Sequence, residues 1–388
     1  MKLIKSMSIY SICHFLVDFV SCIFVLGVAP TFCFDENGEF MQHIYIAEVI
    51  MYNFFAFAFQ VPMGFVMDKL KLYKYVGIIG FCLIGICYAI GFGNAIVLAS
   101  IVGIGNGLFH LEGGVNAYNN SKGKAFLNGL FVAPGAMGIF LGTMFWQALV
   151  PTFIPIILIV VAIILLAFVQ KDELPYLEKE QNEIKEGKIL FKLHDIISIA
   201  LLIGVSIIVR SIGGSAIVYD WKTGFVIGLI YTILVVLGKA FGGFIGDRIG
   251  LKKTALFALL FACISLIIGF KVPFFGYLGI FLFNIPMSIT LLILEKCNLK
   301  YIATMVGLNT LFLFIGYLIC MIPNTMNNFA VLIVSIILAI ISIFFAFKKY
   351  EKGEMWYEKN SVIFSYDKIS RKCCFGRFNK RAMARTYY

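Results

Sequence analysis

Runs of apolar residues, each close to 20 residues long, alternate with short polar stretches along most of the chain. They predict twelve helices, at 7–29, 43–66, 75–93, 95–117, 125–148, 151–170, 195–219, 223–246, 254–270, 272–294, 302–322 and 328–347. A helix of about 20 apolar residues crosses a hydrocarbon core of roughly 30 Å. The runs lack the two-residue alternation of barrel strands. The pattern therefore predicts an all-α membrane protein with twelve transmembrane helices.

The composition agrees with a bilayer environment, since 61% of the residues are hydrophobic and 14% are charged. A soluble domain carries about 25% charged residues. The formal net charge of +11 raises the question of nucleic acid. Much of that charge follows residue 348, however, and bases beside a membrane are attracted to anionic lipid headgroups. We expect the lipid bilayer as a partner and no nucleic acid.

Lysine and arginine fall on one set of loops. That set carries Lys2, Lys5, Lys69, Lys71, Lys74, Lys122, Lys124, Arg248, Lys252, Lys253, Lys296 and Lys300. The other set is nearly bare of bases, and its first loop, TFCFDENGEF, holds three acids. Short basic loops stay in the cytoplasm. We therefore expect a multi-pass protein of the cell membrane with both termini cytoplasmic.

A long polar stretch divides the predicted helices into six and six. It predicts an N-terminal six-helix bundle over 1–170, a cytoplasmic linker over 171–194, a C-terminal six-helix bundle over 195–347 and a basic cytoplasmic tail over 348–388. Membrane transporters are commonly built from such repeated halves.

One repeated motif supports the duplication. GFVMDKLKLYK begins at Gly64 and GFIGDRIGLKK begins at Gly243, with an offset of 179 residues. Glycine permits close approach of two helices, and an acid can bond the N-terminus of a neighbouring helix. We predict a latch at the cytoplasmic side, formed by Gly64, Asp68, Lys69, Gly243, Asp247 and Arg248.

These two loops resemble the signature of the major facilitator superfamily, with Lys69 in place of the usual arginine. The resemblance implies two six-helix bundles around a central cavity that opens alternately to each side. It also implies that the two loops act as cytoplasmic latches and that the protein works as a monomer.

Titratable residues lie inside two apolar runs. HFLVD places His14 and Asp18 on one helix face, and FHLE holds His110 and Glu112. Charge deep in a bilayer costs about 2.5 to 3.5 kcal/mol, and histidine changes charge near physiological pH. We predict that these four side chains form a proton-coupling cluster. Two alternatives stay open: structural polar pairs between packed helices, and ligands of a divalent metal ion.

Both motifs, together with the run GLFVAPGAMGIFLG, are similar to the fosmidomycin-resistance-like branch of the superfamily. That branch implies export of small molecules driven by a proton gradient. The sequence departs from the pattern of many proton-coupled members at Ser100, where they carry arginine. It also has Pro134 before Gly135 where antiporters have Gly-Pro. These departures leave import and export both open.

Other polar or helix-breaking residues mark the remaining candidates. Arg210 has the planar fork that binds a carboxylate, phosphate or phosphonate, although an ion pair or snorkelling is an alternative. We place Arg210 and Asn284 in a substrate site and expect Lys239 to snorkel. The predicted helix-bending residues are Pro134, Gly135, Gly138 and Pro286.

No nucleotide-binding or hydrolase motif occurs in the sequence. We therefore expect neither an enzyme nor a cofactor, and no direct use of ATP. The leading hypothesis is a secondary active transporter that moves a small organic solute with protons, as in drug or metabolite efflux by an antiporter. The alternative is a membrane metal-binding protein or a divalent-metal transporter that uses the histidine and carboxylate cluster.

Overall fold

The computed structural model describes residues 2–90, 93–150, 153–169, 174–185, 191–322 and 327–353. Its α-helices are α1 (Lys2–Ile23), α2 (Gln42–Asn53), α3 (Gln60–Leu70), α4 (Val76–Ala89), α5 (Ala95–Ser121), α6 (Ala125–Leu149), α7 (Ile154–Val169), α8 (Pro175–Lys185), α9 (Leu193–Ser215), α10 (Phe225–Ile249), α11 (Leu251–Gly269), α12 (Pro273–Asn284), α13 (Pro286–Cys297), α14 (Ile302–Met321) and a last helix (Asn328–Gly353). Residue 170, the parts 171–173 and 186–190 of the predicted linker, and the part 354–388 of the predicted tail lie outside these residues.

In the described part of the chain, ten helical spans are long and apolar enough to cross a membrane. The apolar helices α4 and α7 are shorter, with 14 and 16 residues. Each predicted run coincides with one of these segments, which confirms the all-α class and the multi-pass membrane character. That all twelve segments cross the bilayer stays a prediction, because α4 and α7 fall short of the usual length.

The structure corrects several predicted boundaries. The run predicted over 272–294 is two helices, α12 and α13, because Pro286 has no N–H for the helical ladder. α2 passes into α3 through a π-helix at Phe54–Ala58. The predicted linker contains the unexpected helix α8, whose first N–H groups, those of Tyr176 and Leu177, donate to Asn119 Oδ1 at 3.1 and 3.2 Å.

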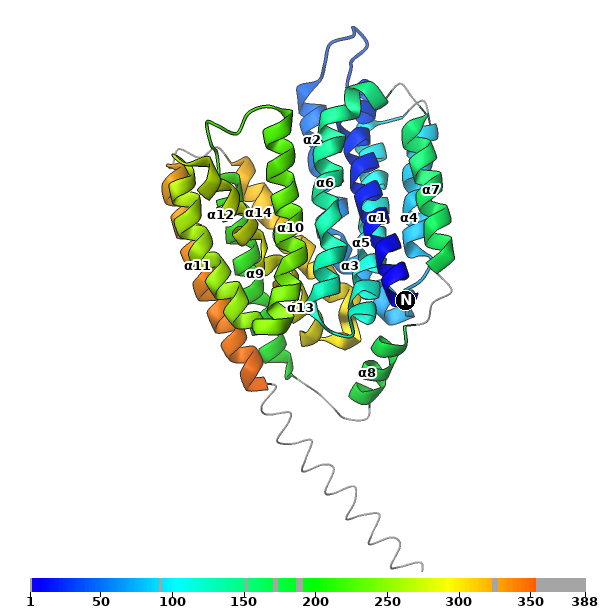
Figure 1. Cartoon of the computed structure of the whole chain (residues 1–388). Helices are drawn as coiled ribbons and strands as arrows, with labels where there is room; N and C mark the ends of the chain where they lie inside the picture. Colours follow the sequence, from blue (N-terminus) through cyan, green and yellow to red (C-terminus); the bar gives the residue numbers. More distant parts are fainter. Residues whose placement is uncertain are drawn as a thin grey trace, which may run out of the picture.

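The helices form two groups that lie side by side (Figure 1). The N half contains α1 to α7, and the C half contains α9 to α14 with the last helix. We call the end with the loops after α3 and α10 the basic end. The opposite end, with the loop 35–39, is the acidic end. The halves meet mainly where α3 packs on α14 and α6 packs on α10.

Glycines permit both of these crossings. A Cβ atom at Gly64 would lie 2.6 Å from the carbonyl oxygen of Ala303, and one at Gly243 would lie 2.2 Å from that of Ala125. Real side chains do not tolerate such contacts with backbone. The repeated glycine of the two motifs is therefore required by close approach of the two halves.

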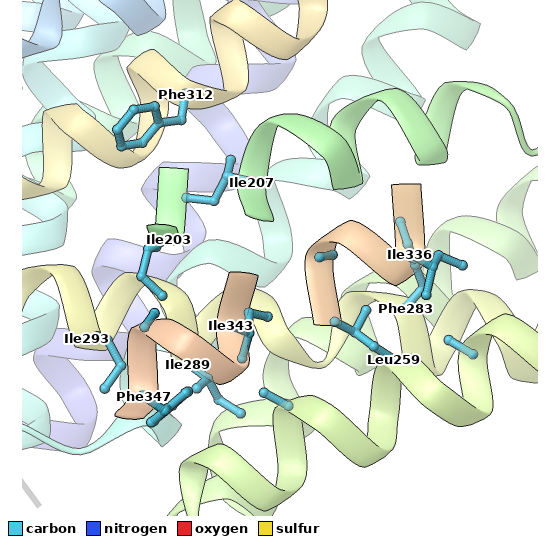
Figure 2. Packing of buried hydrophobic residues seen from close by; sticks show 14 of the residues in the cluster. Ile203, Ile207, Leu259, Phe283, Ile289, Ile293, Phe312, Ile336, Ile343 and Phe347 are labelled. Carbon is cyan, nitrogen blue, oxygen red and sulfur yellow. The ribbon is translucent and has the colours of Figure 1, made fainter. Parts of the chain in front are cut away.

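Each half has its own apolar core. Figure 2 shows the core of the C half, where the labelled residues are Ile203, Ile207, Leu259, Phe283, Ile289, Ile293, Phe312, Ile336, Ile343 and Phe347. A third cluster lies at the basic end and takes residues from both halves and from the segment of α8, among them Met67, Leu177 and Ile302. Shared burial thus joins the halves at the basic end.

Candidate functional site

Three titratable side chains meet inside the N half, two from α1 and one from α5. The Nε2 atoms of His14 and His110 are 2.9 Å apart. Asp18 Oδ2 lies 3.3 Å from His14 Nε2, and Asp18 Oδ1 lies 3.7 Å from His110 Nε2. His14 and Asp18 are buried, with 5% and 9% of their surface exposed. The structure therefore places a compact histidine and carboxylate cluster where charge is costly.

Backbone carbonyl groups determine which ring nitrogen carries hydrogen. His14 Nδ1 lies 2.7 Å from the Phe131 carbonyl oxygen, and His110 Nδ1 lies 2.9 Å from that of Asn106. A carbonyl oxygen only accepts, so both Nδ1 atoms donate. In two neutral rings the Nε2 lone pairs would then face each other at 2.9 Å, which is repulsive. A proton or a metal ion shared at these two atoms removes the repulsion.

Asn106 adds a polar contact that the sequence analysis missed. Its Nδ2 donates to Asp18 Oδ1 at 3.1 Å and to Ser21 Oγ at 3.4 Å. The sequence could have indicated this contact, because Asn106 precedes His110 by one helical turn and therefore shares its face of α5.

Two backbone carbonyl groups beside the proline of α6 accept hydrogen bonds from α1. Pro134 lacks the N–H that would bond the Leu130 carbonyl, and Ser11 Oγ donates to that carbonyl at 3.2 Å. The next carbonyl, that of Phe131, accepts from His14. A Cβ atom at Gly135 would lie 2.4 Å from Asp18 Oδ2. The helix break at Pro134 and the lack of a side chain at Gly135 therefore let α6 approach α1. That these residues bend the helix stays a prediction.

Glu112 lies apart from the cluster, which corrects the expected group of four to a group of three. Its Oε1 accepts from Tyr10 Oη at 2.8 Å, and its Oε2 accepts from the Gly77 N–H at 2.9 Å, at the first turn of α4. Two residues along a helix turn by about 200°. Glu112 therefore faces a different side of α5 from His110.

The two acids of the repeated motif each cap a helix of the opposite half. Asp68 accepts from the N–H groups of Ala303 and Thr304 at 3.0 and 2.8 Å, at the start of α14. Asp247 accepts from the N–H groups of Ala125 and Phe126, both at 2.9 Å, at the start of α6. This agrees with the expectation that the acid bonds a helix N-terminus. That the contacts work as a latch remains a proposal.

Within the part of the chain that the structure describes, the bases of the motif form no ion pair with these acids. Lys69 lies over the ring of Phe65 at 4.6 Å, and Arg248 lies over the ring of Phe244 at 3.8 Å. The two aromatic residues are again 179 positions apart, so both bases stack on the preceding helical turn.

Further polar groups close the basic end. Tyr73 Oη donates to Asp68 Oδ1 at 2.9 Å. Burial, and then the Asp68 carboxylate, raise the pKa of the Tyr73 hydroxyl, so that it stays a donor. Asn128 Nδ2 donates to Glu295 Oε2 across the halves, and Gln181 Nε2 of α8 donates to the Leu299 carbonyl at 3.0 Å.

Two bases of the C half have unused donors. Arg210 Nη2 donates to the Phe283 carbonyl at 3.1 Å, while the buried Nε has no partner among the described residues. Lys239 is half-buried, makes no hydrogen bond or ion pair within the described chain, and lies in electrostatic range of Asp18 and Arg210. Lys239 was expected to snorkel, and that expectation stays a prediction.

Asn284, the other predicted substrate ligand, bonds within its own helix. Its Nδ2 donates to the Ile280 carbonyl at 2.9 Å, one turn back. Asn284 lies two residues before Pro286. Arg210 donates to the carbonyl of Phe283, which lies three residues before the same proline. Both proline sites thus offer a carbonyl to a basic side chain.

No protein-family profile matches the sequence, and no curated protein matches it. Solved structures are similar to it. One is FucP, a major facilitator superfamily transporter in the outward conformation, with a TM-score of 0.62 and 16% identity over 89% of this chain and 99% of that one. Another is an asparagine-to-alanine variant of the E. coli fucose:proton symporter FucP, with a TM-score of 0.60 and 14% identity over the same shares. The chain therefore has the fold of major facilitator superfamily transporters.

Proposed function

We propose that this chain is a secondary active transporter of the major facilitator superfamily that moves a small organic anion, coupled to protons at His14, Asp18 and His110. The fold likeness supports the transporter class. The contact between the two Nε2 atoms supports proton coupling and is the observation that carries the proposal.

One proton satisfies the cluster. Shared between the two rings, it makes them jointly positive, and the adjacent Asp18 carboxylate balances that charge. Loss of the proton restores the lone-pair repulsion between His14 and His110. Because these rings come from different helices and His14 is bonded to α6, proton release changes the packing of α1, α5 and α6. Proton binding is thereby linked to conformation.

An anion suits the bases of the C half. These two cations lie in electrostatic range of each other, and neither forms an ion pair within the described residues. They cost free energy that a bound anion offsets. Arg210 has an unused Nε donor, and Lys239 has an unused ammonium group. A carboxylate or a phosphate ester accepts from both. Asn284 is proposed as a neighbouring polar group of this site.

Alternating access is the proposed mechanism. The two units are the six-helix bundles over 1–170 and 195–347, all twelve helices cross the bilayer, and the linker over 171–194 joins the bundles. The basic end is proposed to face the cytoplasm, where the contacts of Asp68 and Asp247 hold it closed. The protein is proposed to act as a monomer. The resemblance to the fosmidomycin-resistance-like branch favours proton antiport and efflux.

Transport in proteoliposomes tests the proposal. The purified full chain is reconstituted, a pH gradient is imposed, and flux is measured for a panel of mono- and dicarboxylates, phosphate esters, phosphonates and size-matched neutral sugars. We expect gradient-dependent flux of at least one anion, absent from empty vesicles and unchanged in the exposed control E39Q. Absence of flux for the whole panel would overturn the assignment as a transporter. Flux of the same size with and without the pH gradient would exclude proton coupling.

A second candidate is a divalent-metal site. Each of His14, Asp18 and His110 offers a ligand atom, all within 4.8 Å of one another. Metal-bound histidines commonly donate their other ring N–H to a carbonyl, as both rings do here. Zinc requires ligands at about 2.0 to 2.2 Å. Stoichiometric zinc in protein purified without chelator, lost in H110A, would favour this function; no zinc retained after incubation and washing would dismiss it.

A further inference from the structure

A groove at the basic end of the C half takes no part in the proposed transport site. It lies between the start of α11 and the end of the last helix, which run beside each other (Figure 1). Its volume is about 880 Å³, within the range of roughly 300 to 1,000 Å³ that is usual for ligand sites. Most of its lining is apolar and includes Leu256, Phe257, Leu260, Ile341, Phe344 and Phe345. The groove therefore suits a ligand with a large apolar part.

Charged side chains line the same groove. They are Lys252, Lys253, Lys296 and Glu351, which gives the lining a net charge of +2 from three lysines and one acid. Lys252 Nζ lies 2.8 Å from Glu351 Oε2, so these two charges offset each other. Lys253 is exposed and Lys296 is half-buried, and neither forms an ion pair within the described residues. Two positive charges thus remain beside the apolar walls.

The acid that follows Lys296 most closely does not belong to the groove. Glu295 lies in electrostatic range of Lys296, but it is fully buried and accepts a hydrogen bond from Asn128 of the other half. Its carboxyl group is therefore shielded from the groove, and the Lys296 ammonium group is left to an outside anion.

The equivalent place in the N half is covered by protein. Leu251 and Lys253 correspond to Leu72 and Lys74 under the offset of 179 residues. Leu72 and Lys74 line a smaller hollow, of about 400 Å³, together with residues of α8 such as Leu177. Among the described residues of the C half, no helix corresponds to α8. The larger groove is thus open to another occupant.

The chemistry of the groove matches that of an anionic phospholipid. Both helices that form it, α11 and the last helix, are long and apolar enough to cross a membrane. Basic pockets between such helices on the cytoplasmic side bind anionic lipid headgroups, and the basic end is the one proposed to face the cytoplasm. The segment 354–388 carries eight bases and three acids. Its charge has the same sign as that of the groove, so charge complementarity favours a lipid over this segment.

We propose that the groove binds an anionic phospholipid, whose phosphate accepts hydrogen bonds from Lys253 and Lys296 and whose acyl chains lie along Phe257 and Phe344. The inference uses the proposed orientation of the basic end and is independent of the solute and of proton coupling. The bound lipid covers the C half where α8 covers the N half.

Native mass spectrometry of the full chain in detergent measures the headgroup preference. Phosphatidylglycerol and phosphatidylcholine with the same acyl chains are titrated separately. We expect the parent to bind phosphatidylglycerol about tenfold or more tightly, because lysines near a membrane surface attract anionic lipid. K253Q/K296Q should lose this preference, whereas K253R/K296R should keep it. Equal affinities of the parent for both lipids, or a preference retained in K253Q/K296Q, would overturn the proposal.

A matched control removes two lysines outside the groove. Lys124 and Lys300 are exposed bases of the basic end, one in each half, and neither lines the groove. K124Q/K300Q changes the net charge as much as K253Q/K296Q does, and it should keep the preference for phosphatidylglycerol. An equal loss in both double variants would show general attraction to a basic surface and would contradict a defined site.

Photochemical cross-linking identifies the occupant. Benzoylphenylalanine is placed at Phe257 in the groove or at Phe168, an exposed site on α7 outside it. In liposomes with equal amounts of the two lipids, we expect an excess of phosphatidylglycerol adducts at position 257 and no excess at position 168. Adducts at 257 with the segment 354–388 or with a second copy of the chain would overturn the proposal. Absence of flux in the transport assay would count against the proposed function alone.

Discussion

Asp68 and Asp247 stand 179 residues apart, and each carboxylate caps the first turn of a helix in the opposite half of the molecule. The flanking glycines and stacked aromatic residues repeat with the same offset. The two contacts therefore form a symmetric pair at one end of the interface. If they work as the proposed latch, the basic end opens only when both are broken.

The double variant D68N/D247N should weaken closure of the basic end. An asparagine oxygen still accepts, but each contact loses the charge that makes such hydrogen bonds worth about 1.5 to 3 kcal/mol. Spin labels on Lys71→Cys and Lys300→Cys, both exposed and in opposite halves, should report a longer or broader distance distribution. The control E178Q alters an exposed acid of α8. An unchanged distribution in the double variant would show that these contacts do not hold the end closed.

Variants of the histidine cluster should separate coupling from solute movement. Asp18→Asn removes the charge that balances the shared proton, and His110→Ala removes one of its two acceptors. We expect both to lose gradient-driven flux but to keep solute exchange at equal pH within severalfold of the parent. Parent-like gradient-driven flux in both variants would mean that the proton is bound elsewhere.

Two glycines of α6 should respond differently to an added methyl group. At Gly135 the new Cβ would meet side-chain atoms of Asp18 and His14, at 2.4 and 2.5 Å, so Gly135→Ala should displace the cluster and lower coupling with little loss of stability. At Gly138 it would meet the Phe15 carbonyl at 2.4 Å, which only a backbone shift relieves.

Gly138→Ala should therefore destabilise the fold, by about 1 to 3 kcal/mol as for other overpacked sites. Thermal unfolding in detergent measures this, with Gly85→Ala as the control, since its Cβ would meet only Ile159, at 3.4 Å. Equal unfolding temperatures for the Gly135 and Gly138 variants would contradict the distinction.

The parts of this structure that follow from local sequence were predictable. Apolar runs indicated the helices, and the 179-residue repeat indicated two acids at helix N-termini. Helical geometry could also have separated Glu112 from His110, because residues two apart lie on different faces.

Other features depend on how the helices pack against one another, and a local sequence pattern does not predict that packing. Glu48 is the sixth residue of the predicted span 43–66, and the sequence does not distinguish it from an acid at the membrane interface. In the structure α2 packs against α5 and Glu48 is fully buried. The sequence likewise does not show that the crossing of α6 and α10 brings Lys239 within electrostatic range of both Asp18 and Arg210. In both cases the missing information was the direction that a helix face takes.

Lys239 and Arg210 should determine preference for anions. Lys239→Gln keeps a hydrogen-bond donor but removes the charge, and Arg210→Ala removes the guanidinium. Loss of a charged hydrogen bond of about 1.4 kcal/mol weakens binding about tenfold. We therefore expect each variant to lose most of the thermal stabilisation that a panel anion gives the parent, while stabilisation by a size-matched neutral solute is retained. Lys300→Gln, at an exposed base, should behave as the parent. Equal losses for anionic and neutral solutes would instead identify both bases as structural, with Arg210 serving mainly to bond the Phe283 carbonyl beside the break at Pro286.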